Sequence, residues 1–455
     1  MDNKKEMLGT APVKMLLFRL ALPTVLAQLI NMLYNVVDRV YIGHIEGYGD
    51  LALTGVGVCM PIIMIVSAFA ALVASGGAPR ASIFMGKGDM KSAEKTLGAC
   101  FILQLIISAV LTVVLLIWSE DFLLAFGASV NTIGYATAYM KIYALGTVFV
   151  QLTLGLNAFV TAQGFTKISM LSVAIGAFTN IILDPVFIYA FDMGVKGAAL
   201  ATIISQAISC TWLLIFLCGK KAILRLKAEN FNLKPSIILP SIALGIATFV
   251  MQSSESVISV CFNSSLLGYG GDVAVGAMTI LTSVMQFAML PMQGFAQGAQ
   301  PILSYNYGAK NGERVKSTFK LLLTVCLAYS VTLWTLIMLF PSIFVSMFTS
   351  NPALVDFTVG VMRVYFGGLI IFGIQIACQM TFVSLGKATS SVTVAVVRKF
   401  VLLLPLIYIM PTFFENKTLG VYSAEPVADI LAVTFTAILF IFQFKKALNK
   451  IENQD

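Results

Sequence analysis

A carboxylate lies within one of the most apolar stretches of the sequence, GAFTNIILDPVFIY at residues 176–189. Asp184 follows Asn180 by four residues, so both polar side chains share one face of a helix. Pro185 comes next and, lacking an N–H, leaves the carbonyl of Ile181 without its helical partner. A carboxylate, an amide and a freed carbonyl supply oxygen ligands of the kind that a hard cation prefers. The stretch therefore predicts a cation or proton site.

Two further acidic residues are embedded in apolar segments: Asp38 in YNVVDRVYIG and Glu255 in MQSSESVIS. An acidic residue at the centre of a membrane helix costs about 2.5–3.5 kcal/mol, so one that remains is expected to be functional or paired. Glu255 is flanked by Gln252 and by serines, a polar run that cannot face lipid and is expected to line a cavity. Burial there would favour the protonated acid or a bound cation.

The composition places the chain in a membrane. Of its 455 residues, 58% are hydrophobic and only 11% are charged, whereas soluble domains have about 25% charged residues. A membrane helix needs about 20 predominantly apolar residues, and twelve such segments can be traced, so we expect an all-α integral membrane protein. The segments lie at 17–43, 51–79, 94–118, 133–161, 168–190, 197–218, 237–264, 273–301, 317–341, 356–384, 390–411 and 427–444.

The depths of the polar residues within these segments coincide. Asp184 precedes the outer end of its segment by roughly 9 Å at 1.5 Å per residue, and Thr202 and Asp38 fall at similar levels of neighbouring segments. We therefore expect Asp38, Asn180, Asp184 and Thr202 to converge in one pocket that takes Na+ or H+. The structural alternatives are pairing of Asp38 with Arg39, a helix-end role for Asp184, and interhelical hydrogen bonding by Asn180 and Thr202.

The second half of the chain repeats the first. With an offset of 222 residues, MKIYALG at Met140 lies over MRVYFGG at Met362, and Gly76 and Gly86 lie over Gly298 and Gly308. Nearer the start the register slips, so that Asp38 pairs with Glu255. Each half holds six segments, an even number, so the repeats enter the membrane in the same direction and enclose a substrate site between them.

The duplication predicts two parallel six-helix repeats. We expect an N-lobe at residues 1–218, a cytoplasmic linker at 219–236 and a C-lobe at 237–455, with Gln252, Glu255 and Gln286 lining the cavity of the C-lobe. Most of the 29 Lys and Arg residues fall in loops on one side of the predicted topology. This bias predicts a multi-pass protein of the cell (inner) membrane with both termini in the cytoplasm, and it explains the net charge of +8 without a nucleic-acid partner.

The chain resembles the multidrug and toxic compound extrusion (MATE) family, prokaryotic type, over nearly its whole length. The resemblance is carried by ALPTVLAQLINMLYNVVDRVYIG near the start, FMGKGDMKSAEK, GFTK, TNIILDPVFIY and QPILSYNYGAKN. It implies two six-helix lobes that rock between inward-open and outward-open states. It also implies export of cationic amphipathic compounds in exchange for Na+ or H+.

The resemblance extends to individual residues. Asp38, Asn180, Asp184 and Thr202 match the N-lobe cation site of prokaryotic members, and Glu255 matches the acidic residue of their C-lobe. Asn31, Tyr34 and Asn157 resemble the other polar residues of the N-lobe cavity, and Pro23 resembles the proline at which the first helix bends. One branch also carries an Asp in segment 10, where this chain has only Gln375 and Gln379. The N-lobe is therefore the expected coupling site.

The sequence thus predicts a monomeric secondary active exporter that contacts membrane lipids and needs no cofactor other than its coupling ion. The main alternative is a flippase for lipid-linked oligosaccharides or other lipids, which would require a cavity rich in Lys and Arg. Arg39, Arg398 and Lys399 lie within segments, the last two without an evident role. An enzyme is not expected, because no Walker loop, H-E-x-x-H or G-x-S-x-G element is present; a membrane-embedded transferase and a pore-type channel are the remaining alternatives.

Overall fold

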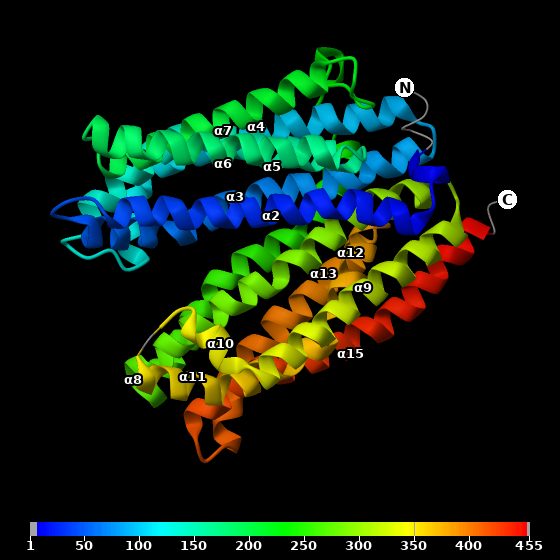
Figure 1. Cartoon of the computed structure of the whole chain (residues 1–455). Helices are drawn as coiled ribbons and strands as arrows, with labels where there is room; N and C mark the ends of the chain where they lie inside the picture. Colours follow the sequence, from blue (N-terminus) through cyan, green and yellow to red (C-terminus); the bar gives the residue numbers. More distant parts are fainter. Residues whose placement is uncertain (1–6, 350, 453–455) are drawn as a thin grey trace.

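The computed structural model describes residues 7–349 and 351–452, which form helices and turns and no β-strand (Figure 1). The helices of the first half are α2 (Val13–Gly43), α3 (Gly49–Gly86), α4 (Met90–Ala125), α5 (Ile133–Ala162), α6 (Thr166–Pro185), η1 (Val186–Ala190) and α7 (Val195–Cys218). They are followed by η2 (Ala228–Asn230), α8 (Pro235–Gly308), α9 (Gly312–Leu339), α10 (Pro341–Ser346), α11 (Pro352–Tyr365), η3 (Phe366–Gly368), α12 (Leu369–Ser384), α13 (Ala388–Val396), η4 (Val397–Leu403), α14 (Leu404–Ile409), η5 (Met410–Phe413) and α15 (Lys417–Glu452).

The helical segments are long and apolar enough to cross a membrane, and the chain is a multi-pass membrane protein. In the described part of the chain eleven helical stretches meet this condition. One of them, α8, has 74 residues and consists of two helical arms that meet at Gly271, where φ is +65°. The predicted segments 237–264 and 273–301 are these two arms, so the absence of a loop between them is a correction to the expected boundaries. Counted this way, the predicted twelve spans are present.

The helices gather into two groups that meet at one end (Figure 1). Helices α2 to α7 pack with one another, as do α9 to α15 with α8, and α8 also packs against α2 and α3 of the first group. The groups adjoin at the end that holds both termini and diverge towards the opposite end. The two groups correspond to the expected N-lobe and C-lobe, whose limits at residues 218 and 237 stay a prediction.

The contact between the lobes is a seam of closely apposed backbones. A Cβ atom added to Gly76 would overlap the carbonyl oxygen of Ser241, and one added to Gly245 would overlap that of Leu72. On the other arm of α8, the hydroxyl of Thr24 donates a 2.6 Å hydrogen bond to the carbonyl of Gly294. Glycine is required along this seam because no side chain fits between the two helices.

The segment between the lobes is packed against the N-lobe. The Oε1 atom of Gln163 accepts hydrogen bonds of 2.9 and 2.8 Å from the backbone N–H groups of Ile223 and Leu224. Lys227 forms a 2.9 Å ion pair with Glu94 on α4. These contacts anchor the linker to the first group of helices.

The seam generates a prediction about glycine substitutions. Gly76→Ala should lower the free energy of unfolding by about 1–3 kcal/mol, because the added methyl group overpacks the seam. Gly57→Ala on the same helix is the matched control, since a Cβ there meets no atom within 4 Å, and it should be neutral or slightly stabilising. Thermal unfolding of the purified protein in detergent measures both. Equal midpoints for the two variants would show that the seam is not tightly packed.

Candidate functional site

Two carboxyl groups of the N-lobe lie against each other inside the membrane-spanning region. Asp38 on α2 and Asp184 on α6 are both buried, and their side chains are within hydrogen-bonding reach of one another. The Nδ2 of Asn180 donates a 3.2 Å hydrogen bond to Oδ1 of Asp184. Three of the four residues expected to form the cation site therefore lie together, with Asp184 in contact with each of the other two.

The site has acceptor oxygens without donors. Oδ1 of Asp38, Oδ1 of Asn180 and Oδ2 of Asp184 are buried and have no hydrogen-bond partner among the described residues. Two negative charges in contact within a low-dielectric environment repel each other strongly, so a proton or a cation is needed between them. The unpartnered oxygens are suited to either, because a carboxylate oxygen or an amide oxygen accepts hydrogen bonds and donates none.

Thr202 joins this group indirectly. Its hydroxyl donates a 3.0 Å hydrogen bond to the carbonyl of Ala198, and the side chain also interacts with the hydroxyl of Tyr139, which lies near Asp38. Sequence reasoning missed Tyr139, because an aromatic residue in an apolar segment carries no signal of its own. Tyr34 lies near both carboxyl groups, and its place in the cavity stays a prediction.

The helix that carries Asp184 changes its winding at Pro185. The missing N–H of Pro185 suggested a break in the helix, but the helix continues as the π-helix η1. In η1 the N–H of Phe191 donates a 2.9 Å hydrogen bond to the carbonyl of Val186. The hydroxyl of Tyr189 in this wider turn donates a 2.6 Å hydrogen bond to the carbonyl of Tyr41 on α2. The π-turn and this bond together fix the helix of Asp184 against the helix of Asp38.

Three other residues predicted for the N-lobe lie outside this contact. Asn31 is exposed, and its carbonyl accepts a 2.6 Å hydrogen bond from Asn35. Asn157 is half-buried with an unpartnered Oδ1. Pro23 is buried within α2, which runs through it as a single helix of 31 residues.

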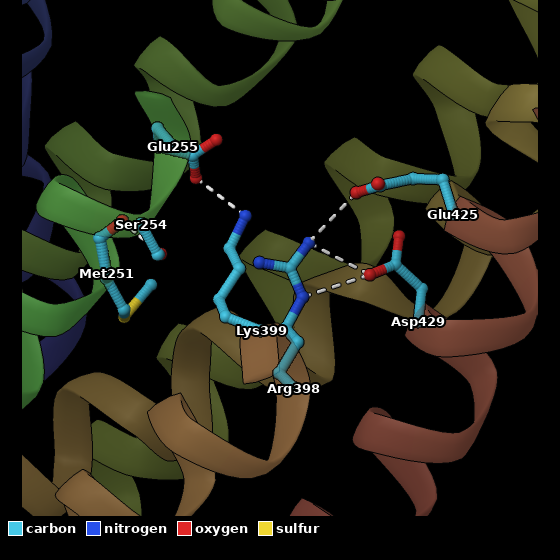
Figure 2. Close-up of polar contacts among 7 residues, drawn as sticks. All are labelled: Met251, Ser254, Glu255, Arg398, Lys399, Glu425 and Asp429. Carbon is cyan, nitrogen blue, oxygen red and sulfur yellow. Dashed lines mark hydrogen bonds and ion pairs between the residues drawn. The ribbon is translucent and has the colours of Figure 1, made fainter. Parts of the chain in front are cut away.

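Glu255, the acidic residue expected in the C-lobe cavity, pairs with Lys399, a residue to which the sequence analysis gave no role. Lys399 of η4 forms a 2.7 Å ion pair with Glu255 (Figure 2), and the side chain of Glu255 is 56% exposed while that of Lys399 is 4% exposed. The expectation that Glu255 would be protonated or hold a free cation is therefore wrong for this conformation. Gln252 and Gln286 are exposed, and their place in the cavity of the C-lobe stays a prediction.

Arg398 is held by two acids that the sequence analysis overlooked. Its Nε and Nη2 donate to Oδ1 of Asp429 at 3.0 and 2.9 Å, and Nη2 lies 3.4 Å from Glu425 (Figure 2). The guanidinium also lies 4.6 Å from the ring centroid of Phe372. Asp429 fell inside the predicted segment 427–444 and Glu425 just before it. Their spacing of four residues, which puts both on one face of α15, was the available signal.

Each lobe thus contains a pair of ionisable side chains at a related position, but the chemistry of the two pairs differs. Asp38 and Glu255 correspond in the repeat, and in each lobe their partner comes from the helix with a π-turn, η1 or η4. In the N-lobe this partner is a second carboxylate, Asp184. In the C-lobe it is the ammonium group of Lys399. The C-lobe therefore has a basic partner for its acid where the N-lobe has a second acid.

The family model described as MatE matches residues 23–186 and 246–409, one stretch in each lobe. This chain belongs to the MatE family. The predicted family and the predicted fold, two repeated helical lobes, are both confirmed. The double match also supports the internal duplication, because one model fits each half of the chain.

The chain is also similar to multidrug export proteins over nearly its whole length. The chain is similar to multidrug export protein MepA of Staphylococcus haemolyticus (strain JCSC1435), with 24% identity over 94% of this chain and 93% of that protein. It is also similar to MepA of Staphylococcus aureus (strain NCTC 8325 / PS 47), with 22% identity over 98% of this chain and 97% of that protein.

Solved MATE structures share the fold. A crystal structure of MATE in the bent conformation covers 99% of both chains with a TM-score of 0.92 and 21% identity. The outward-facing conformation of a multidrug resistance MATE family transporter of the MOP superfamily covers 97% of this chain and 98% of that chain, with a TM-score of 0.90 and 21% identity. At this identity the likeness concerns the fold alone.

The C-lobe ion pairs generate a stability prediction. Asp429→Ala should destabilise the protein by about 3–5 kcal/mol, because it leaves the charge of Arg398 buried with a weaker partner. Lys399→Met is the matched control and should cost about 1 kcal/mol or less, since Glu255 is half-exposed and can be solvated. Thermal unfolding in detergent distinguishes them. A loss of stability that is as large for Lys399→Met as for Asp429→Ala would contradict this description.

Proposed function

We propose that this MatE protein is a secondary active multidrug exporter that expels cationic amphipathic compounds in antiport with Na+ or H+. The observation that carries the proposal is the buried contact between Asp38 and Asp184, with three neighbouring acceptor oxygens unpartnered. Such a pair holds a monovalent cation or a proton in one state and releases it in another. The names of the MepA relatives support multidrug export as the activity.

The coupling follows from competition for the same negative charge. When the coupling cation occupies Asp38 and Asp184, cargo is displaced; when cargo neutralises the site, the cation leaves. Alternation of access requires the lobes to separate at the glycine seam and to close at the diverging end. The π-turn at η1 follows Asp184 directly, and π-turns within helices are frequent at functional sites.

The charge of the helical core favours cationic cargo. Five acidic residues occupy it, namely Asp38, Asp184, Glu255, Glu425 and Asp429, and two of its basic residues, Arg398 and Lys399, are already paired with three of them. A flippase for an anionic lipid-linked sugar would present unpaired basic groups to its cargo. The ion pairs of Arg398 and Lys399 weaken that alternative, which the sequence alone had left open.

The N-lobe is proposed as the coupling site because the C-lobe acid is already neutralised. With Lys399 at 2.7 Å, Glu255 has no requirement for an external cation. Glu255 is exposed within a membrane-spanning helix, where a charge is tolerated only next to water, so it is placed to meet cargo instead. The protein is further proposed to reside in the cell membrane as a monomer with both termini in the cytoplasm, so that the lobes diverge on the outer side.

The function is tested by ethidium transport in liposomes that contain the purified protein, with a Na+ gradient or a proton gradient imposed separately. One gradient should drive transport by the wild type. Asp38→Asn and Asp184→Asn should each reduce the rate to that of protein-free liposomes, because an amide cannot take up or release a cation.

Asp121→Asn, on the exposed end of α4, is the control and should transport as the wild type does. Comparable incorporation of all variants into the liposomes shows that they insert. Full activity of Asp38→Asn or Asp184→Asn would contradict the N-lobe assignment. No ethidium movement under either gradient would contradict multidrug export and direct attention to lipid cargo.

A further inference from the structure

The ion-pair network of the C-lobe contains one more acid than it has bases. Its members are Arg398, Lys399, Glu255, Glu425 and Asp429 (Figure 2). Asp429 accepts hydrogen bonds of 3.0 and 2.9 Å from Arg398, and Glu255 lies 2.7 Å from Lys399. Glu425 is only 6% exposed and has, among the described residues, the longer contact of 3.4 Å with Arg398. Glu425 is therefore the least well neutralised acid of the network.

The ammonium group of Lys399 lies close to two acids. It is paired with Glu255, and it is also near enough to Glu425 for the two charges to interact. In Figure 2 the ammonium group lies between the two carboxyl groups. The side chain of Lys399 is 4% exposed, so its charge needs a partner at all times. A lysine carries its charge on a flexible stem of four carbons, and rotation about these bonds moves the ammonium group from one acid towards the other.

Glu255 is the member of the network that is open to a ligand, since its side chain is 56% exposed. Earlier on α8, Gly245 touches the backbone of α3, and the ring of Phe249 lies 5.0 Å from that of Phe69 on α3. Gln252 follows Gly245 by seven residues and so lies on the same side of α8, with Glu255 beside it at i+3. The exposed carboxyl group therefore lies next to the face of α8 that is turned towards the N-lobe.

We propose that Lys399 is a specificity-determining residue, which competes with cationic cargo for Glu255 and moves to Glu425 when cargo binds. This inference rests on the proposed export of cationic compounds. Cargo must displace Lys399 from Glu255, and an ammonium group left buried without a partner is strongly unfavourable. The surplus acid Glu425 removes that penalty. A neutral compound brings no charge to replace the ammonium group at Glu255, so the exchange favours cations.

The test is the affinity of the purified full-length chain for ethidium, measured by fluorescence in a double-mutant cycle of Lys399→Met and Glu425→Gln. Lys399→Met should bind ethidium about fivefold more tightly, because a weak ion pair with a half-exposed partner no longer has to be opened. Glu425→Gln should bind it about tenfold more weakly, because the displaced lysine lacks its second partner. In the double variant the effect of Glu425→Gln should disappear, so that it binds ethidium as Lys399→Met does.

Lys220→Met removes one positive charge from an exposed turn and is the control, which should bind ethidium as the wild type does. Thermal unfolding shows that each variant is folded, and Lys399→Gln repeats the cycle with a polar side chain. Equal weakening by Glu425→Gln with and without Lys399 would overturn the proposal, because Glu425 would then act on ethidium directly. Unchanged affinity in Lys399→Met would also overturn it. Either result, with ethidium transport intact, rejects this inference alone, whereas a failure of every variant to bind ethidium rejects the cargo class as well.

Discussion

Every ionised group inside the membrane must meet an opposite charge, a proton or water, and this constraint organises the protein. Arg398 satisfies this constraint through two hydrogen bonds to Asp429 and a longer contact with Glu425. Lys399 and Glu255 satisfy it by pairing with each other. Asp38 and Asp184 cannot satisfy it by pairing with each other, because both are acids. The pair that cannot neutralise itself is the one that we propose as the coupling site.

The internal duplication places an acid–acid pair in one lobe and an acid–base pair in the other on the same framework of helices. Both lobes are built from the same order of helices, and both contain a π-turn in the fifth helix of the repeat, next to a proline. The same framework holds a second carboxylate in one lobe and an ammonium group in the other. The glycines between α3 and α8 let the backbones of the two lobes approach closely.

The fold was largely predictable because its signals are strong. Segments of about 20 apolar residues located the spans, and the repeat located the two lobes. The seam was not predictable, because a glycine in a membrane helix has the same appearance whether it faces lipid or another backbone. The joining of two expected spans in α8 was also missed, because the helical arms meet at Gly271 with no loop between them.

The N-lobe site was anticipated through helical spacing and depth, which placed Asp38, Asn180 and Asp184 at one level. The C-lobe network was not, because its members come from three segments distant in the sequence, α8, η4 and α15. Arg398 seemed to lack a role because Asp429 had been read as part of an apolar segment, and Lys399 because its partner Glu255 lies on a helix distant in the sequence. Pairing between distant helices depends on their rotation about their own axes, which local sequence does not specify.

The central claim is that cargo and coupling cation compete for the Asp38–Asp184 pair. Its most direct test is the affinity of the purified protein for ethidium, measured by fluorescence across a series of Na+ concentrations and, separately, of pH values. The wild type should bind ethidium more weakly as one of the two cations rises, and Lys399→Met should keep that dependence. In Asp38→Asn the dependence should disappear. An ethidium affinity that still falls with the cation in Asp38→Asn would contradict the claim and place the coupling ion elsewhere.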